Sequence, residues 1–278
     1  MKKYLIHIVL CIVVNAVGFS QSAEKVKGNR NVIIQQTNIT SFHTIALDED
    51  FEIEIVYNKN PLVEIETDEN LHELIEFQVI DSVLTFNKTA KITSKKRLKI
   101  TVTYDDILQH IVASEDAEIQ SLATMNIENG TLETRGSSKV GLTIKSDDFD
   151  FKGHDKSRVK LNLTANVCNI NLSGSCKLEA LINVPNFKAT LYQRTNANIE
   201  GSSVDAQLEL DNNSQFNGKN FTIKNCAVLC EINSDATLEV LENITIDASG
   251  SSSVYLYENP KITITKLSDT SKLQKKVK

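Results

Sequence analysis

The chain has 278 residues, a formal net charge of −6 and 41% hydrophobic residues. This hydrophobic content is enough to build a core, so the composition excludes an intrinsically disordered chain. The acidic balance, without a basic patch interleaved with aromatic residues, argues against nucleic acid as a partner. There are only 3 prolines and no extended segment with the helical period, so we expect an all-β fold.

The first 20 residues have the features of a secretory signal peptide. Lys2 and Lys3 form a basic start, and the apolar run from Leu5 to Val17 follows it. Small residues then lead to Ser20, after which we predict cleavage. The run is too short to predict a membrane span, so none is expected after processing. We therefore expect an exported protein in the periplasm, at the outer-membrane surface or in the extracellular space.

Short strands follow a polar linker at residues 21–30. Over residues 31–110, segments such as Phe51–Tyr57 alternate apolar and polar residues, which is the pattern of a strand with one buried face. The pair Asp81-Ser82 between two apolar segments predicts a two-residue hairpin. We therefore expect an antiparallel N-terminal part that covers one end of the remaining chain.

Residues 111–264 contain an internal repeat of roughly 20 residues, a period typical of stacked coils. Eight apolar anchors define the alignment: Ile119, Val140, Val159, Leu178, Ile199, Phe216, Leu238 and Val254. A small residue stands two positions before each anchor: Ala117, Ser138, Ser157, Cys176, Ala197, Ser214, Ala236 and Ser252. An apolar residue stands eight positions before each anchor: Ile111, Leu132, Phe151, Ile170, Leu191, Leu208, Cys230 and Ile246.

These three sets of equivalent positions, which we call columns, favour stacked coils over a fold built from hairpins. The two stretches of strand alternation in each repeat are joined by turns rich in Gly, Ser, Asn and Asp. A small residue at one turn position indicates a tight corner between stacked coils. The alternative is an antiparallel sandwich of hairpins, but the turns are longer than hairpin turns and lack the Asn-Gly signal. We predict a stacked β-solenoid, similar to a right-handed β-helix, over residues 111–264.

The remaining residues 265–278 are predicted to be a basic tail. Lys272, Lys275, Lys276 and Lys278 lie in it, and we expect a solvated, frayed terminus. Attachment to a surface through these lysines is the alternative.

Four cysteines follow the predicted signal peptide. An even number in an exported protein is compatible with disulfides. However, Cys168, Cys226 and Cys230 share the alternation of their apolar neighbours and should point inward. Cys226 and Cys230 would lie about 13 Å apart on one strand, beyond disulfide reach. Cys168 and Cys176 could meet only around a sharp corner, so we expect buried free thiols.

Several segments match the pattern of one known family: Phe42-x-x-Ile45 with Phe51–Ile55, Thr67–Leu71, the Ser-Gly-Ser turns at Ser173 and Ser249, and the closing Val254–Pro260. On these residues, roughly the range 30–262 resembles the head GIN domain family of putative auto-transporter adhesins. Members of that family carry more Ser-Gly-Ser-Gly-Asp turns than this chain. The resemblance implies an extracytoplasmic all-β domain with a surface ligand, a glycan or a protein. The resemblance identifies no binding-site residues.

The densest acidic segment is Ser146–Asp155. Oxygen ligands in a loop can bind calcium, but the spacing here lacks the Asp-x-Asp-x-Asp-Gly run of a calcium loop. Phe149 and Phe151 should face the core, which leaves Asp148 and Asp150 to the solvent. We interpret the segment as a solvated strand edge, and we predict no metal site.

No residues with the pattern of a catalytic site are found. Asp116, Asp155 and Asp235 could line one surface of a solenoid, but they are not on adjacent coils. There is no Gly-x-Ser-x-Gly motif, and no histidine accompanies a nucleophile in a known motif. We predict no catalytic or cofactor-binding residues and no cofactor. The expected function is non-enzymatic adhesion or scaffolding in the cell envelope. The alternative is a carbohydrate-active enzyme, a polysaccharide lyase or hydrolase, on the same scaffold.

Overall fold

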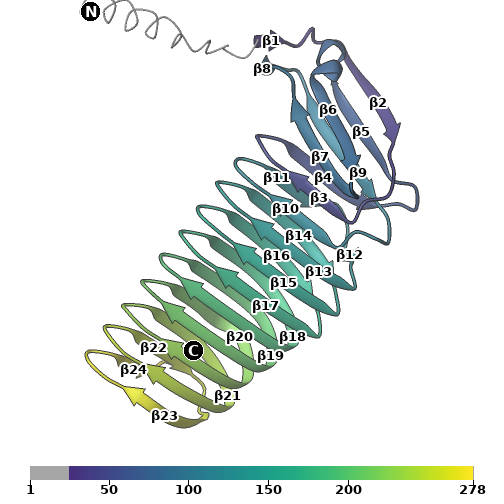
Figure 1. Cartoon of the computed structure of the whole chain (residues 1–278). Helices are drawn as coiled ribbons and strands as arrows, with labels where there is room; N and C mark the ends of the chain where they lie inside the picture. Colours follow the sequence, from purple (N-terminus) through teal and green to yellow (C-terminus); the bar gives the residue numbers. More distant parts are fainter. Residues whose placement is uncertain (1–24, 278) are drawn as a thin grey trace, which may run out of the picture.

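The structure is a computed structural model that describes residues 25–277, so the predicted signal peptide at residues 1–20 lies outside the described residues. It is nearly all β, with 67% strand and 2% helix. The strands stack into a β-solenoid of about 9 turns, with an antiparallel part at the N-terminal end (Figure 1). The predicted fold class is therefore confirmed.

Each coil contributes one strand to each of two faces, which we call face A and face B. Face A is formed by β3 (Thr44–Leu47), β10 (His110–Ala113), β13 (Asn129–Thr134), β15 (Asp148–Gly153), β17 (Val167–Leu172) and β23 (Lys261–Leu267). Face B is formed by β4 (Glu52–Tyr57), β11 (Glu118–Ser121), β12 (Met125–Asn126), β14 (Lys139–Lys145), β16 (Arg158–Thr164), β22 (Ser253–Tyr257) and β24 (Lys272–Lys275). Four longer strands run from face B into face A: β18 (Lys177–Tyr192), β19 (Asn196–Asp211), β20 (Gln215–Cys230) and β21 (Asp235–Ala248).

The N-terminal part adds antiparallel strands and one helical turn. Its elements are β1 (Lys25–Lys27), β2 (Val32–Asn38), β5 (Leu62–Asp68), the 3-10 helix η2 (Glu69–Leu74), β6 (Ile75–Ile80), β7 (Val83–Lys88), β8 (Lys91–Ser94) and β9 (Leu98–Tyr104). The pairs β2–β5, β5–β9 and β6–β7 are antiparallel. The predicted hairpin at Asp81-Ser82 joins β6 to β7, and both residues have positive φ.

Parallel stacking begins earlier than the repeat predicts. β3 and β4 pair in parallel with β10 and β11, so the first coil starts near Thr44 and not at residue 111. This coil lacks the small turn residue because Phe51 occupies that position. On one side Phe51 adjoins the next coil, and on the other it packs against Phe86 of the N-terminal part, with ring centroids 5.7 Å apart.

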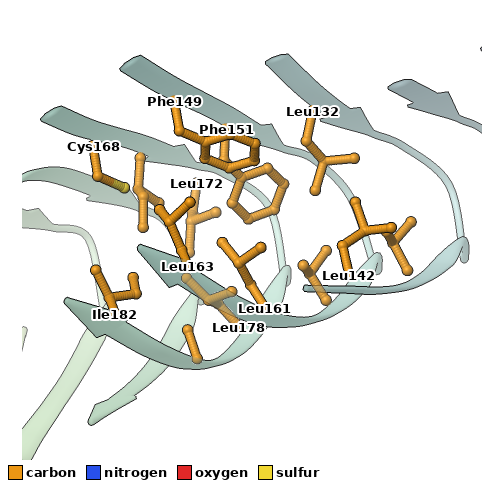
Figure 2. Close-up of a cluster of buried hydrophobic side chains, with 14 of the residues drawn as sticks. Leu132, Leu142, Phe149, Phe151, Leu161, Leu163, Cys168, Leu172, Leu178 and Ile182 are labelled. Atoms are coloured by element: carbon orange, nitrogen blue, oxygen red, sulfur yellow. The ribbon is translucent and has the colours of Figure 1, made fainter. Parts of the chain in front are cut away.

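The core lies between the two faces. Alternate residues of every coil point inward, as in β15, where Phe149 and Phe151 are buried and the flanking aspartates are exposed. Figure 2 shows these rings and the leucines of β14 and β16 meeting in the interior. The expected orientation of Phe149 and Phe151 is therefore confirmed.

The strand register confirms six of the eight predicted repeats and corrects two. Leu178 pairs with Ala197, and Phe216 pairs with Ala236, so the anchors are Ala197 and Ala236 and not Ile199 and Leu238. The same slip of two residues occurs among the apolar residues predicted eight positions before the anchors. Ala189 and Val228, not Leu191 and Cys230, pair with Leu208. The small column therefore continues through Thr195 and Ser234, so Ala197 lies beside Phe216 and not beside Ser214.

The corrected small column marks the sharp corners of the coils. Its members are at most 1% exposed: Ala117, Ser138, Ser157, Cys176, Thr195, Ser214, Ser234 and Ser252. The residue two positions before each of them has positive φ: Glu115, Gly136, Asp155, Gly174, Gln193, Asn212, Ile232 and Gly250. This left-handed conformation reverses the chain within a few residues. Tight corners therefore explain why only small residues occupy the column.

The C-terminal residues continue the stack instead of fraying. β23 extends to Leu267, beyond the predicted solenoid end at residue 264. β24 lies within the predicted tail, residues 265–278, and pairs in parallel with β22. Leu273 supplies the reason, because it falls in register with the buried Val254 and packs against the core.

The four described cysteines are free and buried, as expected. Burial raises the pKa of Cys176 to about 11 and the pKa values of Cys226 and Cys230 to about 12. Burial also raises the pKa of Cys168 far above its usual range. Since the thiolate is the reactive form, none of these groups should react readily in the folded protein.

We therefore predict that a thiol reagent at about pH 8 modifies the folded protein negligibly. After denaturation in guanidinium chloride, the same reagent should modify all four described cysteines. A spectrophotometric thiol assay measures both values. Rapid modification of even one of these thiols in the folded protein would contradict the burial described above.

Candidate ligand-binding face

A shallow groove crosses face B on the outward side of five neighbouring coils. It spans β11, β14, β16, β18 and β19 and encloses about 550 Å³, a volume within the range of small-ligand sites. Its outward-facing lining consists of Ser121, Gly141, Thr143, Lys160, Asn162, Glu179, Leu181, Asn198 and Glu200. We call this set of residues the face-B groove.

Gly141 creates the depth of the groove. It lies in the middle of β14, between Lys139 and Thr143, where a strand would normally present an outward side chain. Its φ is not positive, and a Cβ atom placed on it would have Cγ of Gln120 as its nearest neighbour, at 3.8 Å. The backbone therefore does not require glycine here, and the missing side chain leaves open space.

Most of the outward-facing side chains of the groove are polar. Lys160 and Glu179 from adjacent coils form an ion pair at 3.7 Å, and both side chains are exposed. Leu181 is the apolar contribution, with 43% of its surface exposed. An exposed ion pair in water is worth at most about 1 kcal/mol, so a ligand can separate these charges at little energetic cost.

Side-chain amides form a ladder beside the groove. Asn217 donates to Asn198 at 3.1 Å, Asn198 donates to Asn196 at 3.0 Å, and Asn196 donates to Gln215 at 3.0 Å. Each amide has two donor hydrogens and two acceptor lone pairs. These contacts use only part of that capacity, so the ladder fixes the amide orientations while leaving groups free to bind a polar ligand.

Face A carries a second hollow of the same character, enclosing about 450 Å³. Asn243 donates to Asn225 at 2.8 Å, and Asn225 donates to Asp205 at 3.0 Å. Lys188 and Ala227 also line this hollow. The face-B groove is the larger of the two and the only one with a glycine in its floor.

Comparison with known proteins identifies the family. The model of the family described as putative auto-transporter adhesin, head GIN domain, matches residues 41–181 and 162–260. The chain belongs to this family. The resemblance predicted from the sequence is therefore confirmed. None of the curated proteins matches the sequence.

Solved structures of the same shape include two putative adhesins. The one from Parabacteroides merdae has 16% identity and a TM-score of 0.67, and the match covers 91% of this chain and 99% of that chain. The one from Parabacteroides distasonis has 16% identity and a TM-score of 0.66, with 91% and 100% covered. A putative lipid binding protein from Parabacteroides distasonis has 13% identity and a TM-score of 0.58, with 91% and 99% covered. At these identities the likeness establishes the head GIN fold alone.

The acidic segment Ser146–Asp155 does not converge on a common point. Asp150 accepts a hydrogen bond from Asn169 at 2.9 Å, Asp147 accepts one from Asn166 at 3.1 Å, and Asp155 accepts one from the backbone of Gly136 at 3.1 Å. Among the residues that the structure describes, no group of three or more His, Cys, Asp or Glu side chains could hold a metal ion.

The three candidate carboxylates of the sequence also stay apart. In the corner of its coil, Asp116 directly precedes the small-column residue, Asp155 stands two positions before it, and Asp235 directly follows it. They therefore belong to three different columns. Within residues 25–277 no helix is long and apolar enough to cross a membrane.

Register brings together one pair of side chains that spacing along the chain did not indicate. β3 and β10 place His43 beside His110, with ring centroids 5.9 Å apart. His43 contacts the hydroxyl of Thr44 at 2.7 Å, and His110 contacts that of Thr131 at 2.5 Å. Spacing along the chain did not indicate the face-B groove either. A glycine at an outward position in the middle of a predicted strand, Gly141, is the signal that could have located it.

Proposed function

We propose that this head GIN protein is an exported, non-enzymatic adhesin of the cell envelope whose face-B groove binds a glycan. The observation that carries the proposal is the open groove over Gly141, lined by amide, hydroxyl and charged groups at the regular spacing of the coils. Sugars present hydroxyl groups that both donate and accept, which amides such as Asn162 and Asn198 can match. The adhesin description of the family supports the same reading. Export rests on the signal-like residues 1–20.

A catalytic role for the groove is less well supported. Glycoside cleavage requires two carboxyl groups, one of which holds a proton because it is buried. The groove does contain Glu179 and Glu200, but the Glu179 side chain is 65% exposed, and Glu200 accepts a hydrogen bond from Asn220 at 3.2 Å. The exposed Glu179 side chain therefore lacks the burial that this role requires.

The groove can be filled without disturbing the fold. We predict that Gly141→Val abolishes glycan binding, because the new side chain occupies the floor of the face-B groove. The variant should be as stable as the wild type or up to about 1 kcal/mol more stable, since glycine inside a strand is unfavourable. A glycan array identifies the ligand, and calorimetric titration of that glycan against the variant gives the loss of binding.

Ala227→Val is the matched control, since Ala227 is exposed and lines the hollow of face A. It should leave binding unchanged. Loss of binding in Ala227→Val alone would move the site to face A, and no binding to any glycan would contradict the proposed ligand class. Turnover of a glycan in a parallel assay would favour the carbohydrate-active enzyme instead.

A further inference from the structure

One end of the solenoid is open. Among the described residues β23 pairs only with β21, and β24 pairs only with β22, so the outer edges of both strands have no partner. At the other end, β7 and β9 cover the outer edges of β3 and β4. Figure 1 shows the open coil at the far end of the molecule from the N-terminal part.

Apolar side chains lie on this open end. Ile262 and Ile264 continue the inward columns of Ile244 and Ile246, which are at most 1% exposed. However, Ile262 is 45% exposed and Ile264 is 48% exposed because no coil covers them. Leu267 is 45% exposed for the same reason. These side chains occupy inward positions of the last coil, but they remain in contact with solvent.

The backbone of the open end is also unpaired on one side. The N–H group of Lys272 donates to the carbonyl of Ser252, directly before β22, at 2.9 Å, and the N–H group of Lys276 donates to that of Leu256 within β22, at 2.8 Å. In a parallel ladder the groups of alternate residues point in opposite directions. The N–H and C=O groups of Leu273 and Lys275 therefore face the free edge, where a further strand could bond to them.

The charges of the solenoid indicate what kind of strand fits. Several lysines pair with a glutamate on the adjacent coil: Lys139 with Glu118, Lys160 with Glu179, Lys188 with Glu209 and Lys224 with Glu242. On the last coil, Lys261 and Lys272 are exposed on the outward side, and within the described residues neither has a carboxylate at ion-pair distance. Acidic residues on an added strand would complete the same pattern.

We propose that the open end binds an extended segment of a partner protein by strand addition. The segment follows the shape of a coil. One stretch lies along β23 on face A, where its apolar residues cover Ile262 and Ile264 and an acidic residue lies beside Lys261, and the next stretch lies along β24 on face B, with an acidic residue beside Lys272. Backbone hydrogen bonds to β24 supply affinity, and this placement of apolar and acidic residues supplies specificity. This surface is separate from the face-B groove, so the inference goes beyond the proposed adhesion.

Two other occupants fit the observations less well. A second copy of this chain would bring its own lysines against Lys261 and Lys272, and like charges across paired strands are destabilising. A lipid surface would attract the lysines, but it could not pair the backbone groups of Leu273 and Lys275.

A pair of synthetic peptides tests the proposal on the full chain. One contains the sequence of Phe51–Tyr57, which alternates apolar residues with Glu52 and Glu54, and the other has lysine at both glutamate positions. We expect the acidic peptide to bind at least about tenfold more tightly by fluorescence anisotropy, with a preference that weakens as salt is added. A Lys261→Glu, Lys272→Glu variant should prefer the lysine peptide. Both positions are exposed, so the variant should fold.

Each other outcome would overturn the proposal. Equal binding of the two peptides would show that charge does not select the segment. No binding of either peptide would show that the free edge does not accept a strand. A dimer in sedimentation analysis that Ile264→Lys disrupts would identify a second copy as the occupant. Binding of phosphatidylglycerol vesicles that depends on Lys261 and Lys272, without peptide binding, would identify a lipid surface.

Discussion

Replacing Leu208 with alanine should lower the free energy of unfolding by about 2–5 kcal/mol. Leu208 is 1% exposed and lies in the middle of the stack, in register with Ala189 on one coil and Val228 on the next. The parallel ladder holds the backbone on both sides, so the coils cannot close around the missing methyl groups. The loss therefore includes the cavity as well as the lost burial.

A urea titration measures this change, and Gln207→Ala is its control. Gln207 precedes Leu208 on β19 but points to the solvent, so its replacement should change the stability by less than about 0.5 kcal/mol. Similar small losses in both variants would show that the inward column is assigned to the wrong residues. A lower m value in Leu208→Ala would show that the coils on either side unfold separately, as can happen in repeat proteins.

The alternation of the sequence predicted which residues point inward better than it predicted their register. A slip of two residues keeps every side chain on the same face, so period-2 reasoning cannot detect it. At Ala197 and Ala236, the residues two positions further, Ile199 and Leu238, are also inward and larger. Aligning on the larger residue displaced these two repeats. The backbone corner, not side-chain size, sets the register.

The two ends of the solenoid could not be located from the repeat. At the N-terminal end, Phe51 occupies the small position because an aromatic ring of the N-terminal part covers it, so the repeat pattern is lost there. At the C-terminal end, the lysines around Leu273 suggest a solvated tail, although one apolar residue in register is enough to continue the stack. Terminal coils differ in composition because they have one neighbour instead of two.

The face-B groove was not predictable from motifs because no motif encodes it. It arises where Gly141, Asn162 and Glu179 from successive coils come together, and it depends on the absence of a side chain at Gly141. The resemblance to the head GIN domain family predicted the fold without indicating this surface. In a solenoid, a binding face is therefore a property of outward columns, which become visible only once the register is known.

Replacing Ser157 with leucine should destabilise the protein by roughly 2–5 kcal/mol, because it adds overpacking to lost hydrogen bonds. Ser157 is fully buried in the corner column between Ser138 and Cys176. Its hydroxyl donates to the carbonyl of His154 at 2.8 Å and accepts from Thr134 at 2.9 Å. A leucine would have to enter a space bounded by coils on both sides, and it would leave the buried Thr134 hydroxyl without this partner.

Two further variants separate these causes. Ser157→Ala removes only the hydroxyl and should cost about 1 kcal/mol. Ser251→Leu makes the same substitution at an exposed residue of another corner and should change the stability by less than about 0.5 kcal/mol. Thermal or urea unfolding measures all three. If Ser157→Leu were tolerated as well as Ser251→Leu, the corners could not be tightly packed. The run of Ala, Ser, Cys and Thr at this position from Ala117 to Ser252 would then have no steric explanation.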